Sequence, residues 1–241
     1  MPHETVKQLP EKLLRGPKVN IGIWHTQGVV HPSVFDKIFR GAKTAGLKTA
    51  GLEFFHEDEP KTAANPEYAA MHSFFKQAAQ QAKTAGLEVV NLEKGEPARA
   101  MRYTHEILLK ISQLNGYDSA RIPLYLQQNR QSTDPMVRQH VAIMEALAKK
   151  ITLDKQTVTD LAEAMIMHRS IKMLEKNADL TLTGVQHAAD IAQVSENREV
   201  ILVGDKASSR IRNIAERIRL YEKHRELLKY LDGIAENWKE A

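Results

Sequence analysis

The sequence predicts an α/β fold with a mostly parallel central sheet, helices on both faces of the sheet, a helical insertion in the middle of the chain and a long C-terminal helix. Two observations predict this class. Short, apolar, β-branched segments alternate with longer segments whose apolar residues recur at helical spacing. Glycines stand between several of these helices and the strands that follow, where helix C-termini favour glycine. Because strands joined by helical crossovers run parallel, their carboxyl ends meet at one edge of the sheet, where such sheets bind ligands.

Five segments are predicted to be buried strands, because each is short, apolar and bounded by turn-forming residues. They cover residues 19–24, 49–55, 87–93, 180–183 and 199–203. The helix between the first two strands begins after Pro32 and ends at Gly46, and a longer helix over about 66–85 ends at Gly86. Each glycine marks the point at which the chain leaves a helix for the next strand.

The rest of the chain is mostly helical. Helices are predicted over about 98–114, 135–149, 155–176 and 188–194, and from Ser209 to near the C-terminus. Residues 116–128 are predicted to be an irregular loop, either a plain surface connection or the lid or rim of a site. The long last helix either covers the sheet or pairs with a second copy to form a homo-oligomer.

The composition of the chain further limits its domain organisation, its possible metal ligands and its partners. A chain of 241 residues suits an N-terminal tail over 1–17 and a single α/β domain over 18–241, with the helical insertion around 97–176. With no cysteine, a metal would be held by His, Asp, Glu, backbone or water. The net charge of +4 is spread along the chain, which disfavours a nucleic-acid partner. No segment resembles a signal peptide or a membrane span, which predicts a cytoplasmic protein.

Two quartets far apart in the chain have the same G-x-x-H pattern, and each closes a predicted strand. They are Gly22-Ile23-Trp24-His25 and Gly184-Val185-Gln186-His187. Further titratable residues stand at the ends of the other strands, namely Glu53, Glu93 and Asp205. Since the carboxyl ends of parallel strands share one edge, we expect these side chains to converge on one cleft.

Imidazoles and carboxylates gathered at one edge are typical of a divalent metal site. His25, Glu53 and His187 are the predicted ligands, and Glu53 or Glu93 is the predicted general base that acts on a water. The alternative for each residue alone is a turn or capping position, which for His187 means the cap of the helix that follows. The three residues taken together favour the site.

Arg169 is a further candidate, because it falls four residues after Met165 on the apolar face of its helix. An inward arginine needs an anion such as a site carboxylate or a substrate phosphate, or else it reaches water past the helix end. We expect Arg169 to stabilise an oxyanion in the site. His105 and His140 have no predicted partner and are expected at the surface or in loops.

Several short motifs carry a family resemblance. They are Gly-Ile-Trp-His at 22–25, His-Pro-Ser-Val at 31–34, Gly-Leu-Glu at 51–53, Met-His-Arg-Ser-Ile-Lys-Met-Leu at 167–174 and Leu-Thr-Gly-Val-Gln-His at 182–187. In these motifs the chain resembles the TraB/TIKI proteins, relatives of ChaN and the erythromycin esterases, over about residues 18–218. That family is marked by two G-x-x-H motifs, an intervening Glu and an Arg before the second motif, which correspond here to His25, Glu53, Arg169 and His187. The resemblance implies a ChaN-like fold and, for TIKI members, metal-dependent proteolysis, whereas other members are known for pheromone shutdown, haem-iron binding or ester hydrolysis.

The leading functional prediction is therefore a metal-dependent hydrolase of peptide or ester bonds, with Mn, Co, Zn or Fe as the ion and a small molecule or peptide as the substrate. The alternative is a non-enzymatic protein that binds haem or another anionic small molecule through His and Arg. A third hypothesis is an interaction protein that assembles through its basic surface and its last helix.

Overall fold

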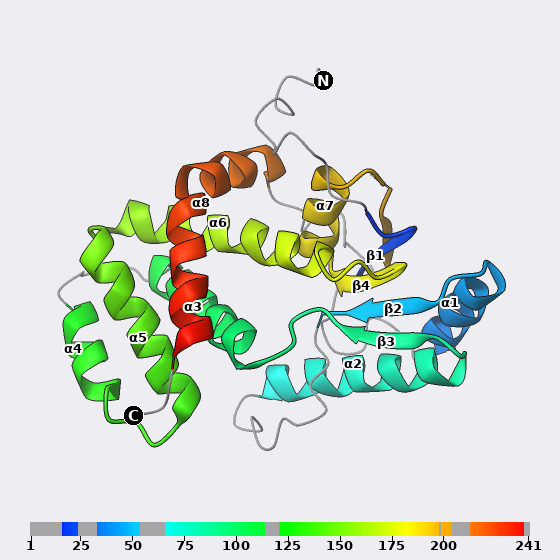
Figure 1. The fold of residues 1–241 in the computed structure, drawn as a ribbon, viewed down its shortest axis with the longest axis horizontal. Helices are drawn as coiled ribbons and strands as arrows, with labels where there is room; N and C mark the ends of the chain where they lie inside the picture. The colour runs from blue at the N-terminus through cyan, green and yellow to red at the C-terminus, as the bar shows by residue number, and fades with distance from the viewer. Residues whose placement is uncertain are drawn as a thin grey trace. The chain divides into compact units, whose positions relative to one another are not determined.

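A computed structural model describes residues 16–23, 33–53, 66–113, 121–197, 199–203 and 213–238 of the chain (Figure 1). The chain divides into two compact units. We call residues 1–94 with 170–214 the sheet unit, and residues 95–169 with 215–241 the helical unit.

Five parallel strands form the sheet unit. They are β1 (Val19–Ile23), β2 (Thr49–Leu52), β3 (Glu88–Asn91), β4 (Leu180–Gly184) and β5 (Ile201–Val203), in the spatial order β3-β2-β4-β1-β5. The predicted α/β class and parallel sheet are therefore confirmed. The order places β4 between β2 and β1, although these two are consecutive along the chain.

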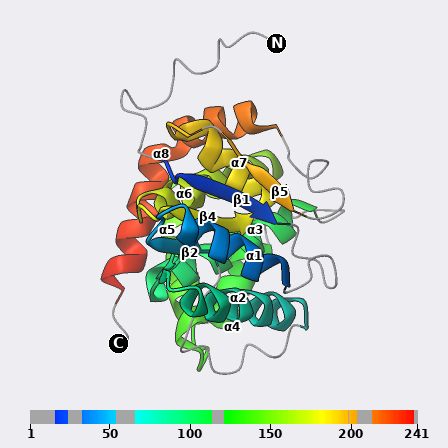
Figure 2. The ribbon, with the colours of Figure 1, turned by 90° about the vertical axis from the view of Figure 1, so that its right-hand side faces the viewer.

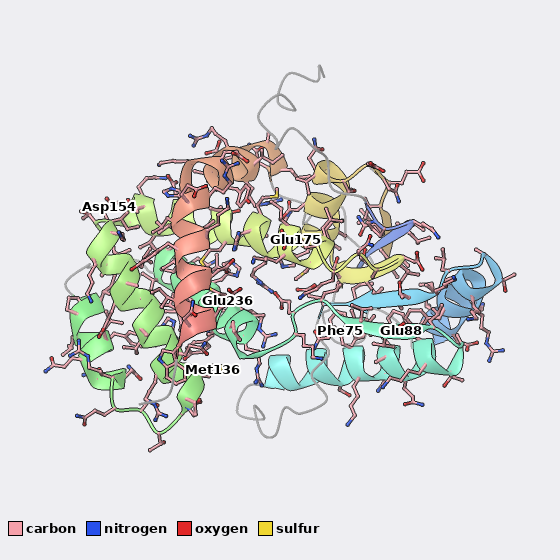
Figure 3. All side chains as sticks on the ribbon, viewed as in Figure 1. Phe75, Glu88, Met136, Asp154, Glu175 and Glu236 are labelled. Carbon is pink, nitrogen blue, oxygen red and sulfur yellow. The ribbon has the colours of Figure 1, made fainter. Side chains whose placement is uncertain are left out.

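Helices cover both faces of this sheet. Figures 1 and 2 show α1 (Ser33–Thr44) and α2 (Pro66–Thr84) on one side and α7 (Val185–Val194) on the other. Alternate strand residues such as Ile21, Ile23 and Leu52 form an apolar core with the α1 and α2 side, which includes Phe75, labelled in Figure 3. This two-residue alternation is what a sheet covered on both faces requires, because successive side chains point to opposite faces.

Glycine ends α1 and α2 in the same way. Gly46 and Gly86 both have positive φ, at 80° and 81°, a conformation that costs glycine little. The backbone N–H of Leu47 donates to the carbonyl of Ala42 at 3.0 Å, and the N–H of Leu87 makes the equivalent bond at 3.0 Å. These bonds satisfy carbonyls of the last helical turn, as in a Schellman motif, and they confirm the predicted helix ends.

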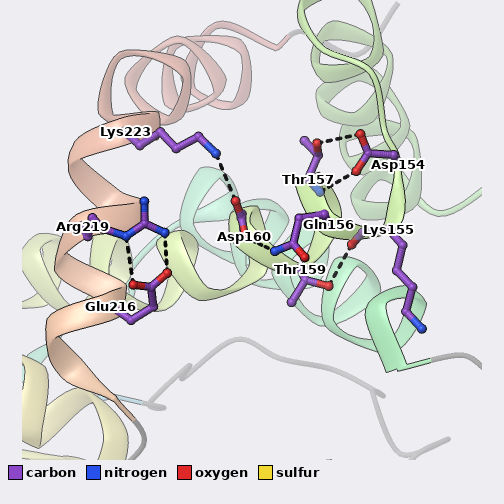
Figure 4. Close-up of polar contacts among 9 residues, drawn as sticks. All are labelled: Asp154, Lys155, Gln156, Thr157, Thr159, Asp160, Glu216, Arg219 and Lys223. Atoms are coloured by element: carbon purple, nitrogen blue, oxygen red, sulfur yellow. Dashed lines mark hydrogen bonds and ion pairs between the residues drawn. The ribbon is translucent and has the colours of Figure 1, made fainter.

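The helical unit contains five helices within the described ranges. They are α3 (Glu96–Gln113), α4 (Arg121–Asn129), α5 (Pro135–Lys150), α6 (Lys155–Leu174) up to residue 169, and α8 (Ile214–Asn237) from residue 215. Figure 4 shows polar contacts within α6 and within α8 and the ion pair that joins the two helices, Lys223 Nζ with Asp160 Oδ2 at 3.0 Å. The amide of Gln139 on α5 donates to the carbonyl of Ala235 at 2.7 Å, so the last helix packs on α5 and α6.

The irregular loop predicted over 116–128 is wrong where the structure describes it. Residues 121–129 form α4, and residues 116–120 of the predicted loop lie outside the described residues. Ile122 and Leu126, one turn apart, are buried and hold this helix against its neighbours. Pro123 is tolerated because it lies in the first turn, where its missing N–H leaves no helical bond unmade. Among the described helices, none is long and apolar enough to cross a membrane.

Candidate functional site

The strand order of the sheet unit makes the carboxyl ends of β1 and β4 neighbours at one edge of the sheet. These strands are neighbours in parallel register, with Ile23 opposite Gly184. The chain leaves β1 through α1 toward β2, but it leaves β4 through α7 toward β5 on the other side. Connections that depart in opposite directions leave from opposite faces, which opens a topological switch point between the two strands. Both G-x-x-H quartets begin at this point.

Glu53 lies at this edge, directly after β2. Its backbone N–H donates to the carbonyl of Leu182 at 3.2 Å, which continues the pairing of β2 with β4. One of its carboxylate oxygens, Oε2, accepts a hydrogen bond from the backbone N–H of Gly184, the N-cap residue of α7. The positive end of a helix dipole favours negative charge at such a position. The sheet and the helix therefore fix this carboxylate in place.

His187 in the first turn of α7 faces the same carboxylate. Its Nε2 lies 3.5 Å from Glu53 Oε1, and the residues are only 6% and 5% exposed. Its Nδ1 lies 2.7 Å from the hydroxyl of Ser170, near the end of α6, and that hydroxyl donates to Asp190 Oδ2 at 3.1 Å. The first turn of α7 has no side-chain cap at Gly184. The contacts described for both ring nitrogens of His187 are with side chains, Ser170 and Glu53.

Glu93 stands at the same edge, beyond β3. The N–H of Leu92 donates to the carbonyl of Leu52 at 3.0 Å, which continues the pairing of β3 with β2 up to this point. The side chain of Glu93 is buried, at 5% exposure. The carboxyl ends of three adjacent strands therefore carry Glu93, Glu53 and the start of the helix that bears His187. His25 and Asp205, predicted at the ends of β1 and β5, lie outside the described residues.

The pair of His187 Nε2 and Glu53 Oε1 fits two ligands of one ion. Two ligand atoms about 2.1 Å from a tetrahedral ion are about 3.4 Å apart, close to the observed 3.5 Å. Imidazole nitrogen and carboxylate oxygen are also the ligand types that the cysteine-free chain offers. Over the ranges that the structure describes, no group of three or more His, Cys, Asp or Glu side chains is arranged to hold a metal ion. A full ligand set would need a residue beyond those ranges, where the predicted ligand His25 lies.

Arg169 belongs to the helical unit and is half-buried there. Its Nη1 donates to His105 Nδ1 at 3.1 Å. Burial, and after it the charge of Arg169, lower the pKa of His105 to about 3, so this imidazole is neutral at neutral pH. The expected role of Arg169 in stabilising an oxyanion stays a prediction.

The expectation that His105 and His140 lie at the surface is wrong. Both are buried in the helical unit, His140 completely, and burial lowers the pKa of His140 to about 4. His140 Nδ1 lies 2.9 Å from the hydroxyl of Thr104. Helical spacing in the sequence could have indicated this burial. His105 follows the buried Met101 by four residues, and Thr104, the partner of His140, follows the buried Ala100 by four, so both lie on the inner face of α3.

The sequence interpretation missed Ser170 and Asp190. Asp190 lies three residues after His187, which places both on one face of α7, but nothing local marks Ser170 as their partner.

Gly22, the glycine of the first quartet, is required by the packing of α7 on β1. A Cβ on Gly22 would lie 2.9 Å from Ala188 Cβ and 3.1 Å from Val185 Cα, so its absence lets α7 approach β1 closely.

Comparisons of the chain with protein-family models, with curated proteins and with solved structures gave no significant match. The class that the fold and the site define is an α/β protein with a buried histidine and carboxylates at the carboxyl edge of a parallel sheet. The resemblance to the TraB/TIKI proteins stays a hypothesis that depends on the motifs named above.

Proposed function

We propose that this protein is a metal-dependent hydrolase whose centre is the carboxyl edge of the sheet, with Glu53 and His187 as ligands of a divalent ion such as Mn, Co, Zn or Fe. The observation that carries the proposal is the 3.5 Å separation of His187 Nε2 and Glu53 Oε1. This distance exceeds a normal N–H···O hydrogen bond, which is about 2.7–3.2 Å, and it suits two atoms that share a cation.

The burial of the pair supports the same proposal. A carboxylate and an imidazole with little exposure to water lose hydration, and a shared cation compensates this loss for both. The bond from Gly184 to Glu53 Oε2 leaves Oε1 on the side of His187. The site also lies at the topological switch point, where parallel sheets bind their ligands.

Each residue then has a defined task. A divalent ion bound here lowers the pKa of a coordinated water and so supplies a nucleophile near neutral pH. Glu53 and His187 hold and orient that ion, and His25 completes the set. Glu93, buried at the neighbouring strand end, accepts the proton as general base. Peptide or ester bonds are the proposed targets, in keeping with the family resemblance.

Metal binding by the purified full chain tests this function. Elemental analysis and calorimetric titration with Mn, Co and Zn should show one tightly bound ion per chain, and His187→Ala should lower its affinity at least 100-fold. The matched control is His168→Ala, which removes another buried histidine, one whose Nε2 lies 2.9 Å from Asp232 in the helical unit. This control should bind metal as the parent does.

Hydrolysis is then measured on chromogenic esters and a labelled protein substrate, with and without the ion. Metal-dependent turnover that His187→Ala abolishes and His168→Ala retains supports a hydrolase. If His187→Ala binds the ion as tightly as the parent protein, the assignment of the site is wrong. Tight metal binding without turnover on any peptide or ester would argue for a binding protein instead.

A further inference from the structure

We propose that Ser170 and Asp190 are positioning residues that hold the His187 imidazole as the tautomer with its proton on Nδ1, so that the lone pair of Nε2 faces Glu53. The inference deepens the proposed function, because that lone pair is what a metal ion at Glu53 requires. It depends on three buried side chains joined in series by contacts of 2.7 Å and 3.1 Å.

The number of protons in this series fixes the direction of each bond. The Ser170 hydroxyl has one hydrogen, and His187 Nδ1 and Asp190 Oδ2 both lie within hydrogen-bond distance of its oxygen, at 2.7 Å and 3.1 Å. The Ser170 hydroxyl donates to Asp190 Oδ2, so its hydrogen is directed to this oxygen. The hydroxyl oxygen then accepts from His187, which must carry its proton on Nδ1. Nε2 of the neutral ring is left with its lone pair on the side of Glu53.

The placement of the three residues makes this arrangement rigid. His187 and Asp190 lie one turn apart on α7, and Ser170 lies near the end of α6 within the sheet unit. Ser170 and Asp190 are completely buried, so water does not compete for their hydrogen bonds. Metal-binding histidines commonly donate their other ring N–H to an oxygen that fixes ring orientation and tautomer, and here a hydroxyl backed by a carboxylate does so.

The same geometry argues against Ser170 as a nucleophile. Its side chain has no exposed surface for a substrate to reach, and its hydrogen is directed to Asp190 rather than to the histidine. In a serine hydrolase the histidine takes the proton of the serine, which needs the opposite direction of this bond. Ser170 therefore acts through His187 and is a positioning residue.

The tautomer of His187 in the metal-free full chain tests the inference directly. In ¹⁵N-histidine-labelled protein at pH about 8, where an ordinary imidazole is neutral, long-range ¹H–¹⁵N spectra distinguish a protonated Nδ1 from a protonated Nε2. The signals of His187 are identified by their loss in His187→Gln. We expect the Nδ1–H form in the parent protein, and a neutral ring with its proton on Nε2, or a doubly protonated ring, overturns the proposal.

Substitutions then separate positioning from simple structural support. Ser170→Ala and Asp190→Ala should each shift His187 toward the Nε2–H form, in the second case because the Ser170 hydroxyl no longer donates to Asp190 and can donate to Nδ1. Asp190→Asn should keep the parent tautomer, because its amide oxygen still accepts from Ser170. The matched control is Ser112→Ala in the helical unit, which removes a helix hydroxyl that donates only to a backbone carbonyl among the described contacts. Circular dichroism checks that each variant is folded.

Zinc affinity is the second measurement. Ser170→Ala and Asp190→Ala should bind zinc about 10–100-fold more weakly than the parent, and Asp190→Asn and Ser112→Ala should remain close to it. If Ser170→Ala and Asp190→Ala leave both the tautomer and the affinity unchanged, the two residues do not position His187. If the parent protein binds no metal but its tautomer responds as expected, the proposed function is wrong and the positioning of His187 stands.

Discussion

The amino ends and the carboxyl ends of the parallel strands, which we call the amino edge and the carboxyl edge of the sheet, each carry a carboxylate that accepts hydrogen bonds from backbone N–H groups. The surroundings of these two carboxylates differ. At the amino edge, Asp179 precedes β4, and its Oδ2 accepts from the backbone N–H of Lys48 at 2.8 Å and of Thr49 at 3.2 Å, where β2 begins. At the carboxyl edge, Glu53 follows β2 and accepts from the backbone N–H of Gly184, where β4 ends. Each carboxylate therefore ties β2 to β4 across one end of the strand pair.

The difference lies in what else each carboxylate meets. The side chain of Asp179 is 24% exposed, and its further described partner is Lys18 Nζ at 3.4 Å. Glu53 is buried at 5% and faces His187. A carboxylate at a strand end is thus not by itself a sign of catalysis, because hydrogen bonds from backbone N–H groups are enough to explain its presence there. Burial opposite an imidazole is the feature that distinguishes Glu53 at the carboxyl edge from Asp179 at the amino edge.

The largest expected effect tests this distinction at both edges. Glu53→Gln should lower the affinity for a divalent ion at least 100-fold, because the amide removes the charge of one ligand yet still accepts from Gly184. Asp179→Asn is the matched variant at the amino edge and should not change the affinity. Calorimetric titration of both variants measures the effect. Equal losses in the two variants would remove the difference between the edges.

The second effect concerns the close approach of α7 to the carboxyl edge. Gly22→Ala should lower the free energy of unfolding by about 2 kcal/mol, because its Cβ would stand 2.9 Å from Ala188 Cβ and must push the helix away. Gly41→Ala on α1, where a Cβ meets nothing within 4 Å, should be neutral or stabilise by up to about 1 kcal/mol. Urea unfolding compares the two. A Gly22 variant as stable as the Gly41 variant would contradict the tight packing.

The third effect tests the amino edge of the sheet, where Asp179 lies. Asp179→Ala should cost about 1–2 kcal/mol of unfolding free energy, because the N–H groups of Lys48 and Thr49 lose their acceptor. Asp179→Asn keeps an acceptor oxygen and should cost less. Metal affinity should stay unchanged in both. Unfolding in urea measures the cost, and a stability equal to that of the parent would show that water replaces the carboxylate at no loss.

Acid should weaken the same contact. The backbone N–H of Lys48, and to a smaller extent that of Thr49 and the charge of Lys18, lower the pKa of Asp179 below its ordinary value. A carboxylate whose pKa is lower in the folded state stabilises the protein above the unfolded pKa of about 3.9, and this stability is lost as the pH falls toward the folded value. The stability difference between the parent and Asp179→Asn should therefore shrink from pH 7 to pH 3. A difference that grows on acidification would contradict the sign.

The sequence predicted the sheet because its signals are local. Gly46 and Gly86 mark helix ends through their own backbone conformation, and Glu53 and His187 were predicted because each stands within a few residues of the carboxyl end of a strand. The placement of β4 between β2 and β1 depends on contacts between segments that are far apart in the sequence. Hydrophobic periodicity within one segment carries no information about such contacts. Ser170 was missed for the same reason, since its bond to His187 joins different helices.

The smallest expected effect is at the rim of the amino edge. Lys18 Nζ lies 3.4 Å from Asp179, but the lysine side chain is 58% exposed, so water and salt screen the pair. Lys18→Ala should change the free energy of unfolding by less than about 0.5 kcal/mol, well below the cost of Asp179→Ala. Urea unfolding at low and high salt measures both variants. If the lysine variant costs as much as the aspartate variant, then the ion pair, and not the backbone N–H groups, stabilises this edge. The similarity of the two cross-strand carboxylates would then be lost, because only Glu53 would depend on the backbone of the neighbouring strand.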